Sequence, residues 1–301
     1  MSILLIILQV LLLALLAPFV QGIIKNTKGW LQSRRGPGYF QMYYDLAKFL
    51  KKDSVLSPTV SWIFKFAPYI YFATALGAAA MVPALLTPAG VSFNNLFVLM
   101  YLFAVGRFFL ALASLDAGST FGGMGGSREM FISVLVEPAL MITVFTVAFK
   151  ANSTGLSLMA DAAAGSAISL SAILAAVAFL ILTVAETGRV PVDNPDTHLE
   201  LTMVHEAMVI EYSGRPVGLI FWASAIKQLV FILLMVNLFI PWNLPGITTA
   251  PATVLWMLAK VLIIAITLAC IETSTNKMRL FRLPGLLAVA GFLSLLAIVA
   301  Q

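Results

Sequence analysis

The chain has 301 residues, of which 61% are hydrophobic and only 10% are charged, and its mean hydropathy is +1.00. Soluble domains carry roughly 25% charged residues, so this composition excludes a water-soluble fold. The net charge of +5 suggests nucleic-acid binding only until the basic residues are located, because their distribution follows membrane topology instead. The single cysteine, Cys270, excludes an intrachain disulfide and gives no sign of a metal or iron–sulfur site.

Eight stretches of the chain are long and apolar enough to cross a membrane as helices, which requires about 20 residues each. They lie at about 2–23, 61–87, 95–114, 131–149, 165–185, 217–240, 252–272 and 284–300. The first lacks a basic start and a small-residue cleavage site, so we interpret it as a span and not as a signal peptide. The sequence therefore predicts an all-α, polytopic membrane protein whose residues 1–301 form a single integral membrane domain.

The basic residues predict the orientation of the spans. Of 18 Lys and Arg residues, thirteen lie in the loops after spans 1, 3, 5 and 7, whereas the loops after spans 2, 4 and 6 hold only Lys150. By the positive-inside rule, the loops at about 24–60, 115–130, 186–216 and 273–283 are cytoplasmic. We expect a multi-pass protein of the cell (inner) membrane with both termini on the non-cytoplasmic side.

The first of these loops contains a predicted amphipathic helix. Apolar side chains recur at helical spacing from Tyr39 to Leu50, and Gln41, Asp45 and Lys48 occupy the opposite face. This pattern is typical of an interfacial helix lying on the membrane. Attraction to anionic lipids explains the basic charge of the loop. It does not explain the segment Arg34-Arg35-Gly36-Pro37-Gly38, in which two cations adjoin a conformationally restricted turn.

The loop at 186–216 is acidic, on the side where membrane proteins usually carry positive charge. Its six acids outnumber two arginines, and Asn194-Pro195-Asp196 is a typical helix start. If that helix continues, three of the acids fall within about 60° of one another around its axis. The loop is either an acidic solvated face or a surface that docks a partner or collects protons. The acids are Glu186, Asp193, Asp196, Glu200, Glu206 and Glu211.

Charged residues inside the spans give the sharpest functional prediction, because a charge in the bilayer is costly and usually belongs to an ion pathway. For Glu137 the structural alternative is simple neutralisation of Arg128 or Arg107. We expect two lysines, Lys227 and Lys260, to lie deeper than the glutamates. The predicted proton or ion pathway comprises Arg107, Glu137, Glu186, Asp193, Glu200, Glu211, Lys227, Lys260 and Glu272.

Other patterns predict no catalysis and no metal. The glycine run at 122–126 does not follow a strand and is not a phosphate-binding loop. His198 and His205 are seven residues apart without a third ligand nearby. The chain also lacks the residue arrangements of nucleophilic catalysis. We therefore expect no catalytic residues, no metal ligands and no nucleic-acid partner.

Several motifs together resemble a known family. The segment from Ala185 to Pro195, read as AETGRVPVDNP and followed by Glu211-Tyr212-Ser213-Gly214, resembles the longest cytoplasmic loop of the membrane subunit 1 of respiratory complex I. Arg34-Arg35-Gly36-Pro37-Gly38 is similar to that family's first loop. Arg128, followed nine residues later by Glu137, is similar to the start of its fourth span. These motifs cover nearly the whole chain in the family's order.

Two features resemble one branch of that family in particular. The compact Arg-Arg-Gly-Pro-Gly form and the segment Leu115-Asp116-Ala117-Gly118-Ser119 are similar to formate hydrogenlyase subunit 4, found in energy-converting nickel–iron hydrogenases. The stretch from Asp193 to Glu211 is longer than expected in either branch, and His198 stands where an acid is common. The roles of individual acids in this loop are therefore open.

The resemblance implies a non-catalytic membrane anchor that couples electron transfer in a soluble arm to proton or sodium translocation. It implies hydrogenase-like large and small subunits, iron–sulfur subunits and antiporter-like membrane subunits as partners, which would hold the nickel–iron centre and the iron–sulfur clusters. Whether a quinone binds is left open. The alternatives are the quinone-binding subunit of complex I proper and a stand-alone secondary transporter, although no internal duplication is seen. The residues expected in a docking or quinone-cavity-like loop are Arg34, Arg35, Gly36, Pro37, Gln41, Asp45, Arg128 and Arg189.

Overall fold

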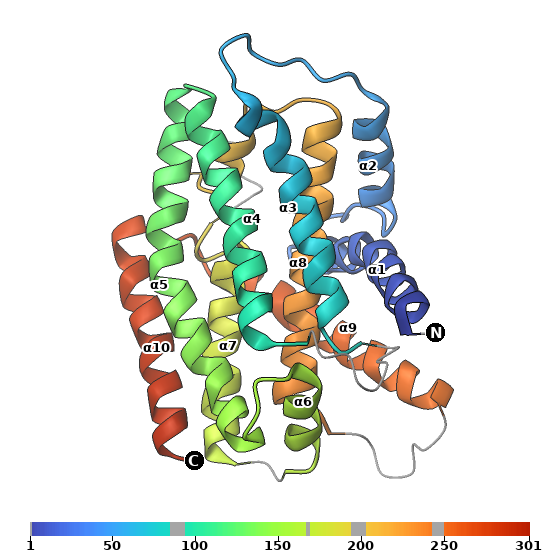
Figure 1. Cartoon of the computed structure of the whole chain (residues 1–301), viewed down its shortest axis with the longest axis vertical. Coiled ribbons are helices and arrows are strands. Elements are labelled where there is room, and N and C mark those ends of the chain that lie inside the picture. Colours follow the sequence, from blue (N-terminus) through green and yellow to red (C-terminus); the bar gives the residue numbers. More distant parts are fainter. Residues whose placement is uncertain (1, 85–93, 167–168, 194–202, 243–249) are drawn as a thin grey trace.

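The computed structural model describes residues 2–84, 94–166, 169–193, 203–242 and 250–301 (Figure 1). The described chain is almost entirely helical, and its β-structure is one isolated bridge between Asn95 and Gly155. The helices are α1 (Ser2–Leu31), α2 (Gln41–Lys51), α3 (Trp62–Met81), α4 (Leu96–Asp116), α5 (Thr120–Ala151), α6 (Leu156–Ala164), α7 (Leu170–Glu186), α8 (Arg215–Phe239), α9 (Ala250–Ser274) and α10 (Leu283–Val299), with 3-10 turns η1 (Glu206–Val209) and η2 (Leu280–Arg282).

Seven of the described helices are long and apolar enough to cross a membrane, namely α1, α3, α4, α5, α8, α9 and α10. The eighth expected span is α7, which is apolar but has only 17 residues. The predicted all-α, multi-pass architecture of about eight spans is confirmed. In Figure 1 most spans stand side by side, while α1 and α9 are inclined to the others.

The core of the bundle is α8. Of the apolar 18-residue stretch of α8, 78% is buried inside the protein, whereas the corresponding share is 50% or less in each of the other six long spans. Small side chains let the remaining helices approach closely, as between α3 and α4. A Cβ at Gly106 of α4 would lie 2.5 Å from the Thr74 hydroxyl oxygen of α3, so the glycine is required there.

Two of the expected loops are shorter than predicted because their helices are longer. α1 continues to Leu31 instead of ending near residue 23, and α5 begins at Thr120 instead of residue 131. The expected loop at 115–130 therefore reduces to residues 117–119, where the Ser119 hydroxyl accepts from the amide of Gly122 and caps α5. With 32 residues, α5 is about 48 Å long and exceeds the bilayer core. Hydropathy alone cannot locate helix ends that lie outside the apolar region.

The predicted amphipathic helix is present as α2, and one face of it packs against α8. Met42 and Leu46 are buried, and the Phe49 ring lies 5.8 Å from that of Phe221 on α8. A Cβ at Gly218 would lie 3.0 Å from the Phe49 Cβ, so this glycine lets the two helices meet. Figure 1 shows α2 standing beside α8. Part of its apolar face therefore packs on the protein itself.

The connections divide between the two ends of the bundle. One end, which we call the long-loop end, carries residues 32–61, 117–119, 187–193, 203–214 and 275–282. Ser213 joins two of these loops, because its hydroxyl accepts from the Val55 amide at 2.7 Å and donates to the Val55 carbonyl at 2.8 Å. The opposite end, called the far end, carries α6. The charged residues within the spans lie at different positions between these two ends.

Candidate functional site

Five charged side chains from four helices form an inner ion cluster, which consists of Arg107, Glu129, Glu137, Glu186 and Lys227. Arg107 of α4 lies at its centre. Its Nη1 is 3.0 Å from Glu137 Oε1, its Nε is 3.8 Å from Glu129 Oε1, and its Nη2 donates to Glu186 Oε1. Lys227 Nζ of α8 lies 2.9 Å from the same Glu186 oxygen.

The regular spacing of α5 supplies one wall of this cluster. Glu129, Ser133 and Glu137 follow one another at intervals of four residues, which places them on one face of the helix. The Ser133 hydroxyl donates to Glu137 Oε1 at 3.1 Å and accepts from Arg107. The hydroxyl therefore fixes the carboxylate and the guanidinium relative to each other.

Burial is uneven across the inner ion cluster. The side chains of Arg107, Glu186 and Lys227 are 5%, 4% and 8% exposed, whereas that of Glu137 is 47% exposed. Glu137 lines a small cavity of about 90 Å³ between α4 and α5. Three carboxylates face two cations, so the fully ionised cluster carries a charge of −1. Glu137 is the member best placed to exchange a proton or to meet a cation from outside the chain.

A second buried group, the loop ion cluster, lies toward the long-loop end and consists of Lys28, Arg189, Gln228 and Glu272. Lys28 Nζ of α1 is 2.7 Å from Glu272 Oε2 of α9, and Arg189 Nη1 is 3.5 Å from Glu272 Oε1. Arg189 Nη2 donates to Gln228 Oε1 of α8 at 2.6 Å. Gly188, with a φ of +60°, turns the chain at the end of α7 and so directs Arg189 into the bundle.

The two clusters meet on α8. Lys227 belongs to the inner ion cluster and the next residue, Gln228, belongs to the loop ion cluster. Beyond the loop ion cluster, Lys277 Nζ lies 2.8 Å from Asp193 Oδ1. The other oxygen of Asp193 accepts from the amides of Val204 and His205 at 3.1 and 3.0 Å. Charged and polar groups thus extend from the long-loop end to Glu137.

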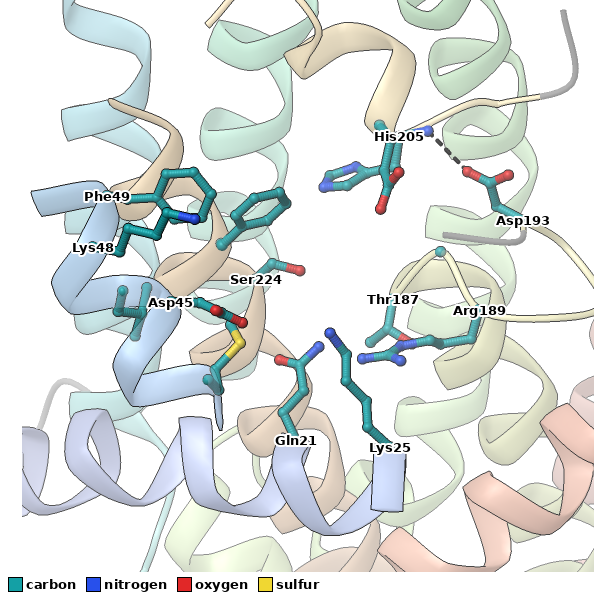
Figure 2. A pocket seen from close by; sticks show the side chains of 15 residues that line it. Gln21, Lys25, Asp45, Lys48, Phe49, Thr187, Arg189, Asp193, His205 and Ser224 are labelled. Carbon is teal, nitrogen blue, oxygen red and sulfur yellow. Dashed lines mark hydrogen bonds between the residues drawn. The ribbon is translucent and has the colours of Figure 1, made fainter. Parts of the chain in front are cut away.

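A cavity of about 400 Å³ adjoins the loop ion cluster at the long-loop end, and we call it the α1–α2 cavity. Figure 2 shows Gln21 and Lys25 reaching into it from α1 below, Arg189 from the right and His205 from above. Asp45 of α2 also lines it. Burial lowers the pKa of His205 below its ordinary value of 6.5, so this imidazole is neutral at pH 7.

The first-loop motif lies at the surface, outside the α1–α2 cavity. Arg34 and Arg35 are exposed, and a Cβ at Gly36 would lie 2.8 Å from the Asn26 Cα of α1. The Asn26 amide nitrogen donates to the Pro37 carbonyl at 2.9 Å. The turn is therefore held tightly against α1 while its two cations project outward. On the adjoining helix, Gln41 donates to Asp45 at 3.0 Å.

The structure separates two predicted residues from the clusters and decides between two alternatives for a third. Lys260 lies apart from both clusters and lines a separate cavity with Asn237, near the far end of α8. Glu211 is an exposed turn residue, and the described residues just before it form only the short η1. Of the two cations considered as partners of Glu137, Arg107 lies 3.0 Å from it, whereas Arg128 Nη1 donates to the Met203 carbonyl at 3.0 Å. The expected helix start at 194–196, His198 and Glu200 lie outside the described residues.

Sequence reasoning missed three members of the clusters, namely Glu129, Lys28 and Gln228. Glu129 and Lys28 were assigned to loops because the predicted spans were too short. The interval of eight residues between Glu129 and Glu137 is the sequence signal that could have identified Glu129. Gln228 carries no charge, and only the structure reveals its hydrogen bond from Arg189.

Comparisons with known proteins identify relatives of this chain. The family described as NADH dehydrogenase matches residues 3–301. Formate hydrogenlyase subunit 4 of Escherichia coli K12 is 34% identical over 309 residues, covering 99% of this chain and 100% of the relative. Hydrogenase-4 component C of the same organism is 34% identical over 237 residues, covering 78% and 74%. An NADH-quinone oxidoreductase subunit of Syntrophotalea carbinolica is 30% identical over 259 residues, covering 79% and 75%.

A solved structure shares the fold. A chain of the membrane-bound sulfane sulfur reductase, described as an archaeal respiratory membrane complex, superimposes with a TM-score of 0.82 at 18% identity. The alignment covers 98% of this chain and 99% of that chain. At this identity the likeness concerns the fold alone.

Proposed function

This chain belongs to the NADH dehydrogenase family, and we propose that it is the membrane anchor and coupling subunit of a formate hydrogenlyase-type, energy-converting hydrogenase complex. The similarity to formate hydrogenlyase subunit 4 over the full length of both chains supports this branch of the family. In this role the chain carries no catalytic residue. It links electron transfer in a soluble iron–sulfur arm to the movement of protons or sodium ions.

The observation that carries the proposal is the continuity of the two ion clusters across α8. Burying charges in a bundle that spans a membrane is expensive, and such charges are usually retained for ion movement. The loop ion cluster lies toward the long-loop end, and Glu137 opens to the flank of the bundle. Within each cluster, charged pairs separated by 2.7–3.8 Å make the preferred protonation of one group depend on the charge of its neighbour, and the clusters adjoin at Lys227 and Gln228.

Two different partner surfaces follow from this arrangement. The long-loop end, with its exposed Arg34, Arg35 and Glu211, suits a soluble arm of hydrogenase-like and iron–sulfur subunits. The flank of α4 and α5 around Glu137 suits an antiporter-like membrane subunit, which would supply the next ionisable group. The nickel–iron centre and the iron–sulfur clusters are then held by the partners.

The basic residues of loops 32–61 and 275–282 support an orientation with the long-loop end in the cytoplasm. Both termini would then lie on the non-cytoplasmic side. Accessibility of a cysteine introduced by Ser33→Cys, tested with an impermeant thiol reagent in right-side-out and inverted vesicles, checks this orientation. Labelling of the introduced thiol in right-side-out vesicles would contradict it.

A quinone-binding role, as in NADH:quinone oxidoreductase, is the second candidate, and the α1–α2 cavity is the observation that favours it. Its volume of about 400 Å³ and its lining by Lys25 and His205 offer space and hydrogen-bond donors for a carbonyl-bearing ring. We propose that this chain works without quinone reduction. Extraction of quinone from the purified complex is then expected to leave electron transfer unchanged, and a loss restored by added quinone would favour the second candidate.

Purification of the complex through a tag on this chain tests the branch assignment. The proposal predicts that a nickel-binding large subunit with paired cysteine motifs is recovered with it, together with iron–sulfur and antiporter-like subunits. Recovery of flavin-binding and NADH-binding subunits instead would assign the chain to a complex I. Purification of the chain without any partner would contradict both roles and favour a stand-alone transporter.

A further inference from the structure

A cavity of about 250 Å³ at the far end lies apart from both ion clusters. It is formed between α6, α8 and α9, and its polar lining includes Asp161 of α6, Asn237 of α8 and Lys260 of α9. Lys260 is only 6% exposed, whereas Asp161 is exposed. One wall therefore presents a buried cation, and the other presents a carboxylate in contact with the surroundings.

The cavity lies near the far end of α8, because Asn237 precedes the last residue of that helix, Phe239, by only two positions. Two tryptophans lie close together on the adjoining part of the chain, and the Trp256 indole donates to the Trp242 carbonyl at 3.1 Å. Tryptophans of membrane proteins are enriched at the membrane–water interface, where phospholipid headgroups lie. Lys260 Nζ is 5.7 Å from the centroid of the Trp256 ring, a contact that suits an ammonium cation.

Within the described ranges, no carboxylate forms an ion pair with Lys260, although its side chain is buried. Residues 85–93 and 243–249, which precede α4 and α9 in the chain, contain no Asp or Glu in their sequences. A buried ammonium group is costly unless it is paired. The partner of Lys260 is therefore expected from outside the chain.

We propose that this far-end cavity binds the headgroup of an aminophospholipid, with its phosphate at Lys260 and its primary ammonium group at Asp161. The negative phosphate of the headgroup complements the Lys260 cation, and its positive ammonium group complements the Asp161 carboxylate. A lipid is favoured over a protein partner because the exposed residues of α9 nearby are aliphatic, namely Leu255 at 67%, Ile263 at 55% and Ile266 at 44%. Such a face is typical of contact with acyl chains.

The test measures lipid retention by the intact, delipidated complex after exchange into mixtures of phosphatidylethanolamine and phosphatidylcholine, using native mass spectrometry. The wild type is expected to retain one phosphatidylethanolamine preferentially. Lys260→Gln removes a charge-assisted contact and should weaken retention of both lipids by roughly tenfold or more. Asp161→Asn should keep the phosphate contact but abolish the preference for the primary amine over the trimethylated headgroup.

Matched variants separate the proposal from its alternatives. Lys260→Arg keeps the cation and should keep retention, while Lys150→Gln removes an exposed cation of the far end and should change nothing. Equal lipid retention by the wild type and Lys260→Gln would overturn the proposal. Displacement of the lipid by millimolar inorganic phosphate would overturn it too and identify a simple anion site instead. Failure of this test leaves the coupling role untouched, because Lys260 belongs to neither ion cluster.

Discussion

Replacing Glu186 by Gln should destabilise the centre of the bundle more than any exposed substitution. Glu186 Oε1 accepts from Arg107 and lies 2.9 Å from Lys227 Nζ, and all three side chains are at most 8% exposed. At an effective dielectric constant of about 20, the direct attraction across 2.9 Å is about 6 kcal/mol. Part of it offsets desolvation, so the expected net loss on breaking the pair is about 3–5 kcal/mol.

A double-mutant cycle shows whether the loss comes from the pair itself. Glu186→Gln leaves Lys227 buried without its carboxylate, and the further change Lys227→Gln removes that unpaired cation. The double variant should therefore recover on the order of 2 kcal/mol relative to additivity. Hydrogen exchange of peptides from α7 and α8 in the assembled complex measures the opening free energy. Glu211→Gln, at an exposed turn, is the control and should stay within about 0.5 kcal/mol of the wild type. Additive effects at 186 and 227 would refute the pairing.

Three further predictions concern the long-loop end. The pKa of His205 in the folded chain is lowered below 6.5, so the unfolded chain binds the proton at a higher pH than the folded chain does. The stability of the fold should therefore decrease as the pH drops from 6.5 toward the folded pKa. In a series of thermal melting curves, His205→Asn should remove this pH dependence. Gly214→Ala, at a φ of +60° with the Asp53 carbonyl oxygen in the place of the new Cβ, should cost about 1–3 kcal/mol in the same assay, whereas Gly38→Ala, with open space around it, should be neutral. Charge reversal of Arg34 and Arg35 should reduce recovery of the soluble arm in pull-downs without changing the yield of membrane subunits.

The spans could be predicted from the sequence because a bilayer allows only helices of nearly fixed length. Helix ends outside the apolar region could not, and the misplaced start of α5 concealed Glu129 in a supposed loop. The charged residues within spans could be identified because placing a charge in the bilayer is energetically costly. Their pairing could not, because it depends on how each helix is rotated about its own axis. This is why Glu137 could be selected while its partner, Arg107 or Arg128, was left open.

Lys260 shows a second limit of sequence reasoning. A lysine within an apolar stretch is expected at depth, yet α9 is inclined (Figure 1) and Lys260 lines a cavity together with Asn237, near the end of α8. Hydropathy gives neither tilt nor depth. The α1–α2 cavity was likewise not predictable in detail, since it depends on α2 standing beside α8 through the contact at Gly218.

The central claim is that the buried ion network couples electron transfer to ion movement, and simultaneous measurement of both in sealed vesicles tests it most directly. Glu137→Gln keeps the shape and the Ser133 contact of the half-exposed carboxylate but removes its charge. The account predicts an assembled complex in which the number of ions moved per electron pair falls to near zero. Lys150→Gln, an exposed position near the far end of the same helix, should keep the wild-type ratio. An assembled Glu137→Gln complex with the wild-type ratio would contradict the account.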